Sequence, residues 1–148
     1  MTRALFWTTT TLITVAGYAQ NVDSHLAEVN ALFNGHVKFR IDRDDRFVAD
    51  IYGEQGLVRQ DVAYVEFLDA DAVAYSDEEQ AVVIKCNGAE AQCIDKEIFK
   101  LNAIRHTGRS VLQIAPGSKD AAIAALSALI RACQVALAAE RAAATMPK

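Results

Sequence analysis

Residues 37–51, VKFRIDRDDRFVADI, contain the pattern that decides the fold of this chain. Apolar residues alternate with charged ones over 37–41, which is the two-residue period of a strand with one buried face. The polar run at 43–45 predicts a turn, and the alternation resumes over 47–51. This stretch therefore predicts two consecutive strands joined by a tight polar turn.

Short segments of the same kind, separated by turn residues, continue toward residue 115. Further strands are predicted at Leu57–Arg59, Ala63–Leu68, Ala72–Tyr75, Gln80–Cys86, Cys93–Leu101 and Ser110–Ala115. No helical pattern separates these segments, so the strand–helix–strand units of parallel sheets are not expected. The middle of the chain predicts an antiparallel β-sandwich or a partly open barrel of about seven strands.

A short helix is predicted before the first strand. Asp23 or Ser24 can serve as its N-cap, and the helix runs to about Phe33. Asn34-Gly35 ends it because both residues tolerate a left-handed backbone. The apolar stripe of this helix repeats at spacings of three and four: Val22, Leu26, Val29 and Phe33.

A second, long helix is predicted at the end of the chain. Pro116-Gly117 stops the last strand, Ser118 caps the helix, Asp120 lies near its positive end, and the helix reaches about Ala143. Its apolar stripe consists of Ile123, Leu126, Ile130, Cys133 and Leu137. The stripe indicates packing on the sheet, and a coiled-coil seam between subunits is the alternative. We expect a monomer or a weak homo-oligomer.

These elements predict an α+β, mainly β fold: the sandwich or open barrel, capped by the long C-terminal helix and preceded by the short one. The element order from Gly35 to Ala143 resembles the pleckstrin-homology-like fold. That resemblance implies a binding or adaptor module, many of which hold phosphoinositides and others peptides. The phosphoinositide role is not carried over, because acidic residues are interleaved with the basic residues of the first hairpin. A helix-first cone that resembles nuclear-transport-factor-like proteins is the alternative fold.

The segment 1–19 has the layout of a secretory signal peptide. A positive start precedes the uncharged stretch 4–16, and small residues stand three and one before a cut ahead of Gln20. The uncharged stretch is shorter than the roughly 20 apolar residues of a membrane span, so we expect cleavage and no stable membrane insertion. Residues 20–148 then form a single domain, located in the periplasm or secreted.

Export changes what the three cysteines mean. A disulfide between Cys86 and Cys93 is favoured in an oxidising compartment, and two reduced thiols are the alternative. The residues between them look like a hairpin loop, whose closure stabilises by about 2 to 3 kcal/mol. Face-to-face pairing sets Ile84 opposite Asp95, so a bulge or a shifted register is expected. Cys133 is predicted to pack as a small hydrophobe.

Composition and motifs limit the chemistry. The net charge of −4 makes nucleic acid a poor partner, because clustered lysine and arginine are expected there. His25, His36 and His106 lie apart, and no Cys-x-x-Cys, serine-hydrolase elbow, phosphate loop or dinucleotide fingerprint occurs. We therefore predict no catalytic residues, no cofactor and no enzymatic activity.

Acidic residues cluster around one predicted hairpin, where oxygen ligands could in principle hold calcium. They are Asp69, Asp71, Asp77, Glu78 and Glu79. Val73 and Ala74 break the EF-hand pattern, so the prediction is a polar hairpin end and no metal site.

The segment 105–110 is the candidate for binding a small anion. Arg105 and Arg109 could clamp a carboxylate or phosphate, with His106 between them, and Gly108 would allow a close backbone approach. The alternative is an ordinary strand connection with solvated arginines.

Two functional hypotheses follow. The first is a non-catalytic exported domain that binds a protein or peptide through a sheet edge or face. The second is a small-ligand-binding protein or hydrolase with a pocket near Arg105–Arg109. A self-associating structural subunit is a third possibility, based on the alanine-rich C-terminal helix.

Overall fold

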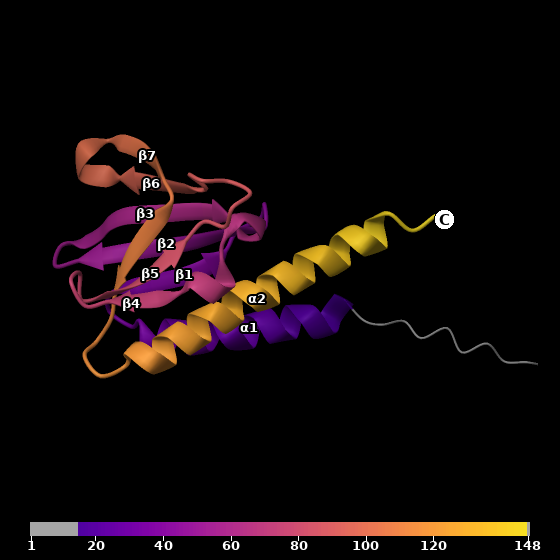
Figure 1. Ribbon diagram of the computed structural model, residues 1–148, viewed down its shortest axis with the longest axis horizontal. Helices are drawn as coiled ribbons and strands as arrows, with labels where there is room; N and C mark the ends of the chain where they lie inside the picture. The colour runs from indigo at the N-terminus through magenta and orange to yellow at the C-terminus, as the bar shows by residue number, and fades with distance from the viewer. Residues whose placement is uncertain (1–14, 148) are drawn as a thin grey trace, which may run out of the picture.

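The computed structural model describes residues 15–147, which form two antiparallel sheets with two helices along one side (Figure 1). In chain order the elements are α1 (Val15–Leu32), β1 (Val37–Ile41), β2 (Arg46–Gly53), β3 (Gly56–Tyr64), η1 (Val65–Phe67), η2 (Ala70–Ala72), β4 (Ala74–Ser76), β5 (Ala81–Lys85), β6 (Ile94–Ile98), η3 (Phe99–Leu101), β7 (Ala103–Thr107), β8 (Arg109–Gln113) and α2 (Lys119–Ala144). The η elements are single 3-10 turns. This confirms the predicted α+β sandwich, open rather than closed, with its long C-terminal helix. The described residues contain eight strands, where about seven were expected.

The chain changes sheets three times. The larger sheet has the strand order β1-β2-β3-β6-β7, and the smaller one has the order β4-β5-β8. The chain leaves the larger sheet after β3, builds the β4–β5 hairpin, and returns to place β6 beside β3. After β7 it crosses again, so that β8 pairs with β5. Strands far apart in the sequence therefore pair within each sheet, and the crossing segments of the chain link the two sheets.

The region after the second strand differs from its prediction. The sequence predicts separate strands at 57–59 and 63–68, but the structure has one strand, β3, followed by η1. The polar residues in the middle of β3 stay extended because this strand pairs with β2 on one side and β6 on the other. Arg59 and Asp61 also bind each other there, which satisfies both charges.

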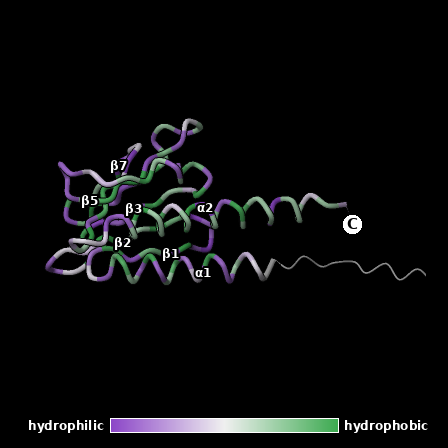
Figure 2. Tube along the Cα trace, turned by 60° about the horizontal axis from the view of Figure 1, so that its bottom comes forward, coloured by the Kyte–Doolittle hydropathy of each residue, from purple (hydrophilic) through white to green (hydrophobic). Residues whose placement is uncertain are grey.

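The hydrophobic core lies between the sheets and extends under the helices. Phe33, directly after α1, Phe39 of β1 and Phe47 of β2 form a row, with ring centroids 5.0 and 5.5 Å apart along it. Each of the three side chains is at most 1% exposed. In Figure 2 the hydrophobic colour runs through the strands and along parts of both helices. The two-residue alternation of the first hairpin thus supplies core residues, as predicted.

Helix α1 begins at Val15, well before the predicted N-cap at Asp23 or Ser24. It extends further because its early turns lie against α2: Tyr18 and Val22 share a pocket wall with residues of that helix. The predicted end is confirmed, since Gly35 has a φ of +83°. Most of the predicted signal peptide, residues 1–14, lies outside the described residues, and the predicted cut ahead of Gln20 falls within α1.

Helix α2 starts at the predicted position, with Ser118 as N-cap residue, but the Ser118 side chain makes no capping hydrogen bond. By length and composition α2 could cross a bilayer, a property shared by core helices of globular proteins. Here its middle section is buried against α1 and the smaller sheet. The buried residues are Ala122, Ala125, Leu126, Leu129, Ile130, Ala132 and Cys133. The apolar stripe is therefore used for core packing within the chain.

Candidate functional site

One edge of the larger sheet is occupied by a helix. The side chain of Asn30, from α1, accepts a hydrogen bond from the backbone N–H of Phe39 at 2.7 Å. It also donates one to the Phe39 carbonyl oxygen at 2.9 Å. A single amide side chain thus pairs with the outer edge of β1 as a neighbouring strand would. This edge is not free to accept another chain at that point.

The opposite edge is open. Strand β7 pairs with β6 on one side, and no strand among residues 15–147 pairs with its other side. Arg105 and His106 are exposed, and Ile104 is 62% exposed. An edge strand carries unpaired backbone N–H and C=O groups, which form a template for an added strand. The larger sheet thus has one covered edge and one available edge.

Exposed apolar residues lie at the hairpin tips next to this edge. Because Arg59 of β3 lies opposite Ile98 of β6, the β2–β3 tip and the β6–β7 tip are neighbours at the same end of the sheet. The apolar residues at these tips are 40% to 57% exposed: Tyr52, Leu57, Val58, Phe99 and Leu101. Exposed apolar residues gathered in one place are typical of interaction surfaces.

The predicted anion-binding loop is wrong as secondary structure. Arg105 and His106 lie in β7, whereas Arg109 begins β8 in the other sheet. Arg105 and His106 are consecutive in a strand, so their side chains point to opposite faces. The short connection at Gly108 allows both strands to form because each has its own partner, β6 or β5. The structure therefore does not present these three side chains as one clamp.

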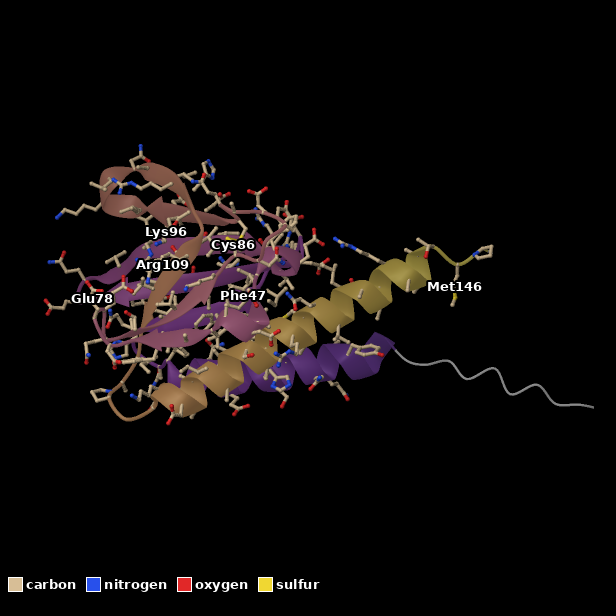
Figure 3. The ribbon with its side chains drawn as sticks, viewed as in Figure 1. Phe47, Glu78, Cys86, Lys96, Arg109 and Met146 are labelled. Atoms are coloured by element: carbon tan, nitrogen blue, oxygen red, sulfur yellow. A yellow bond between two sulfur atoms is a disulfide. The ribbon has the colours of Figure 1, made fainter. Side chains whose placement is uncertain are left out.

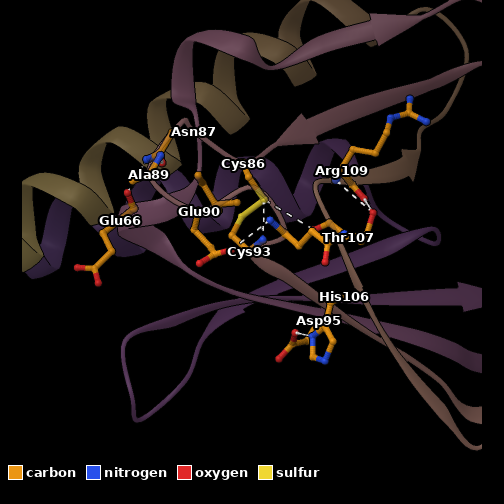
Figure 4. Close-up of a disulfide and its surroundings, with 12 residues drawn as sticks. Glu66, Cys86, Asn87, Ala89, Glu90, Cys93, Asp95, His106, Thr107 and Arg109 are labelled. Carbon is orange, nitrogen blue, oxygen red and sulfur yellow. Dashed lines mark hydrogen bonds and ion pairs between the residues drawn. A yellow bond between two sulfur atoms is a disulfide. The ribbon is translucent and has the colours of Figure 1, made fainter.

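Two of these three predicted residues have acidic partners. Arg109 donates two hydrogen bonds to the Glu79 carboxylate, at 2.9 and 2.5 Å. This contact raises the pKa of Arg109 and lowers that of Glu79. His106 Nδ1 lies 2.5 Å from an oxygen of Asp95 on the outer face of the sheet (Figure 4). Arg105 is left as the exposed cation of the three, without an ion pair among the described residues.

Gly108 has a structural role that the sequence did not reveal. A Cβ atom at this position would lie 2.6 Å from the carbonyl oxygen of Ala91. The close approach predicted for a ligand is thus made by the segment between Cys86 and Cys93. Glycine at 108 is explained by packing inside the chain.

A polar cluster missed in the sequence links the two sheets. Asp61, on the inner face of β3, is 2% exposed and accepts hydrogen bonds from Arg59 at 2.9 and 3.0 Å. Arg59 also donates to the carbonyl oxygen of Val111 in β8, at 2.9 Å. The hydroxyl of Ser110, which is fully buried, donates to the Asp61 carboxylate. Asp61 lies two positions before the buried Ala63 on the same strand, so both face the same side of the sheet. This alternation was the one feature of the sequence that could have indicated a buried Asp61.

Lys96 lies beside this cluster. It stands in β6 directly opposite Asp61 of β3 on one side and Arg105 of β7 on the other. Burial is the main cause that lowers the pKa of Lys96, and the charges of Arg59 and Arg109 lower it further (Figure 3). The carboxylates of Asp61 and Glu79 oppose this shift. Two cations, Lys96 and Arg105, are therefore adjacent on the inner face of the open edge.

The disulfide between Cys86 and Cys93 is confirmed (Figure 4). The expected hairpin loop is wrong, because the bond closes the connection between β5 of the smaller sheet and β6 of the larger sheet. Since β5 and β6 do not pair, no bulge or shifted register is needed. The connection is anchored by Asn87, which bonds the carbonyl oxygens of Phe67 and Glu66, each at 2.7 Å. The disulfide thus helps to hold the sheets in place.

Cys133 is the remaining cysteine, and it is 6% exposed on α2. Burial raises the pKa of its thiol to about 12. The thiol therefore stays protonated at neutral pH and packs as a small apolar group, as predicted.

The acidic cluster does not converge on one point. Asp71 pairs with Arg131, Asp69 accepts a hydrogen bond from the Asp71 backbone N–H, and Glu79 pairs with Arg109. Within residues 15–147, no three histidine, cysteine or acidic side chains gather as metal ligands.

The pockets described for residues 15–147 lie away from the β7–β8 connection. One, of about 170 Å³, lies between the helices and is lined by residues such as Val22, Ile41 and Leu137. The other three flank the first hairpin, the end of α2 and the start of α2. None of these four includes Arg105, His106 or Arg109 in its walls.

Comparison of the chain with protein-family models, curated proteins and solved structures finds no match. The resemblance to the pleckstrin-homology-like fold stays a prediction. The functional argument therefore depends on the geometry of this molecule alone.

Proposed function

We propose that this protein is a non-catalytic binding domain that receives an extended segment of another protein along the outer edge of β7. The contrast between the two edges of the larger sheet carries this proposal. Asn30 occupies the β1 edge, whereas β7 is paired on one side only. An added strand would complete the backbone hydrogen bonding of β7, and side chains on both faces would provide selectivity.

The surroundings of β7 support binding over catalysis. A hydroxyl beside a carboxylate is the arrangement that could serve as a nucleophile, and here it is formed by Ser110 and Asp61. Ser110 is fully buried, and its hydroxyl donates its hydrogen bond to Asp61. A substrate could contact this buried hydroxyl only if both sheets rearranged. The exposed apolar residues at the adjoining tips would instead add contact area for a partner.

An exported location is part of the proposal. The disulfide is compatible with an oxidising compartment. The layout of segment 1–19 supports secretion, with cleavage ahead of Gln20. We place the working domain in the periplasm or outside the cell.

A random-peptide display library, selected on the purified protein, tests the proposal. Bound peptides should slow amide hydrogen exchange of residues 103–107 and leave the helices unaffected. Binders that protect the pocket between α1 and α2, or a selection that yields no specific binder, would contradict strand addition.

A pair of proline variants sharpens this test. Successive backbone N–H groups of a strand point to opposite edges, and proline has no N–H group. Of the two variants Ile104→Pro and Arg105→Pro, one therefore removes an N–H group that points away from β6. The other removes an N–H group that pairs with β6. The variant that keeps the wild-type melting temperature should lose peptide binding. Unchanged binding in that stable variant would contradict the use of the β7 backbone.

A further inference from the structure

The side chains on the inner face of the β7 edge favour one kind of added segment. Lys96 and Arg105 lie directly opposite each other on neighbouring strands. Like charges at directly opposite positions destabilise a sheet. The two nearby carboxylates are already engaged: Asp61 by Arg59 and Ser110, and Glu79 by Arg109. Asp61 also lies directly opposite Lys96 and offsets part of its charge, so the cation without an ion pair among residues 15–147 is Arg105.

An added strand would bring a side chain to this pair. Neighbouring strands lie about 4.8 Å apart, so a residue opposite Arg105 on the new strand stands next to its guanidinium. A carboxylate at that position would accept hydrogen bonds from Arg105 and reduce its repulsion with Lys96. Such a contact would give Arg105 the carboxylate partner that it lacks among residues 15–147.

On the outer face of the same edge, acidic side chains of an added strand would be unfavourable. Ile104 lies opposite Glu97 of β6, and His106 lies opposite Asp95. Acidic side chains on this face of an added strand would therefore meet Glu97 and Asp95. An apolar side chain next to Ile104 would instead cover a surface that is 62% exposed.

Because side chains of a strand alternate between faces, these two requirements specify a pattern. We infer that β7 binds an extended protein segment in which acidic and apolar residues alternate, with the acidic residues facing Lys96 and Arg105. This inference rests on the proposed function, since it presupposes strand addition at β7.

A second copy of this chain fits the edge less well. Two β7 strands paired antiparallel about their centres would set Arg105 directly against Arg105 of the other copy. This repulsion would add to the one that already exists with Lys96. The charge pattern thus favours a partner of different sequence.

Three capped peptides test the pattern: one alternates valine with glutamate, one valine with glutamine, and one valine with lysine. Titration calorimetry on the full domain should show the glutamate peptide binding about five to ten times more tightly than the glutamine peptide, and the lysine peptide most weakly. The preference should shrink at high salt, because these charges are accessible to solvent.

Charge reversal provides the matched comparison. Arg105→Glu should reverse the order, so that the lysine peptide binds best. Arg43→Glu makes the same charge change at an exposed site in the β1–β2 turn, and it should leave the order unchanged. A preserved order in Arg105→Glu would overturn the inference.

Amide hydrogen exchange separates the two proposals. If all three peptides protect β7 and bind equally, strand addition stands and the acidic preference is wrong. If none protects β7 at millimolar concentration, strand addition fails and the preference fails with it.

Inorganic phosphate is the small-anion probe, and phosphate that binds more tightly than the glutamate peptide would also overturn the inference. Sedimentation showing a β7-dependent dimer would identify a second copy as the occupant instead.

Discussion

At the β1 edge, Asn30 bonds both backbone groups of Phe39, and Phe33 packs its ring edge-on against the same residue. At the β7 edge, Arg105 and His106 face solvent, and the outward backbone groups have no strand beside them in residues 15–147. Both strands end the same sheet, yet only β1 is integrated into the core. We therefore expect substitutions near β1 to change stability, and substitutions near β7 to change binding.

The largest expected effect is at the covered edge. Phe33→Ala removes a fully buried ring between α1 and β1, and it should lower the free energy of unfolding by about 3 to 5 kcal/mol in urea titrations. Phe99→Ala, at the open end where the ring is 40% exposed, should cost about 1 kcal/mol or less. Equal losses for the two variants would contradict the difference between the edges.

The second-largest effect on the free energy of unfolding is expected at the disulfide, because it holds the side of the molecule that no helix covers. Replacing Cys86 and Cys93 together by serine should lower the free energy of unfolding by about 2 to 3 kcal/mol, the effect of closing a short loop. Reduction of the wild-type protein should reproduce the loss, measured by thermal unfolding with and without reductant. A double variant as stable as the oxidised protein would show that the bond contributes nothing to the fold.

Asn30→Ala should open the β1 edge at moderate cost. Two hydrogen bonds worth about 1 kcal/mol each are lost, and the higher helix propensity of alanine returns about 0.6 kcal/mol. The net loss of about 1.4 kcal/mol should be accompanied by faster amide exchange at Phe39. Asn21→Ala, at an exposed position of the same helix, is the control: it should leave amide exchange at Phe39 unchanged and raise the free energy of unfolding only by the helix-propensity gain of about 0.6 kcal/mol.

The smallest effect is expected at the centre of the open edge. Ile104→Thr keeps a β-branched side chain at a position that is 62% exposed, and it should change the free energy of unfolding by less than about 0.5 kcal/mol. Ile94→Thr, on the adjacent strand and 1% exposed, should cost several times more. A large loss for Ile104→Thr would mean that β7 is part of the core, against the contrast drawn here.

Local periodicity predicted much of the fold. The alternation around Phe39 and Phe47 identified core residues, and the spacing of Leu126, Ile130 and Cys133 identified the buried face of α2. Both patterns depend on neighbours within one element, so they are visible in a single sequence. The approximate positions of β4 and β5 were predicted for the same reason.

Strand partners were not predictable in this way. Cys86 and Cys93 are close in sequence, which suggested a hairpin, but β5 pairs with β8 and β6 pairs with β3. The sequence contains no local mark of these long-range pairings. The same limitation affected the predicted site: Arg105 and Arg109 are four positions apart, yet they belong to different sheets.

The candidate binding edge was only partly predictable. A sheet edge was proposed as one binding surface without naming its residues, whereas Arg105 was named for a different site, the small-anion loop. Which strand ends the sheet depends on the complete pairing order, and the role of Lys96 depends on its position opposite Arg105. The engagement of Asp61 by Ser110 likewise requires contact between two sheets.

The contact between Gly108 and the Ala91 carbonyl has a geometric consequence for the molecule. The disulfide-closed connection acts as a spacer at the place where the chain turns from β7 into β8. A bulkier residue at 108 would push this connection away from the β7–β8 turn. The spacing between the end of β7 and Arg109 at the start of β8 is thus set by the absence of a Cβ atom at position 108.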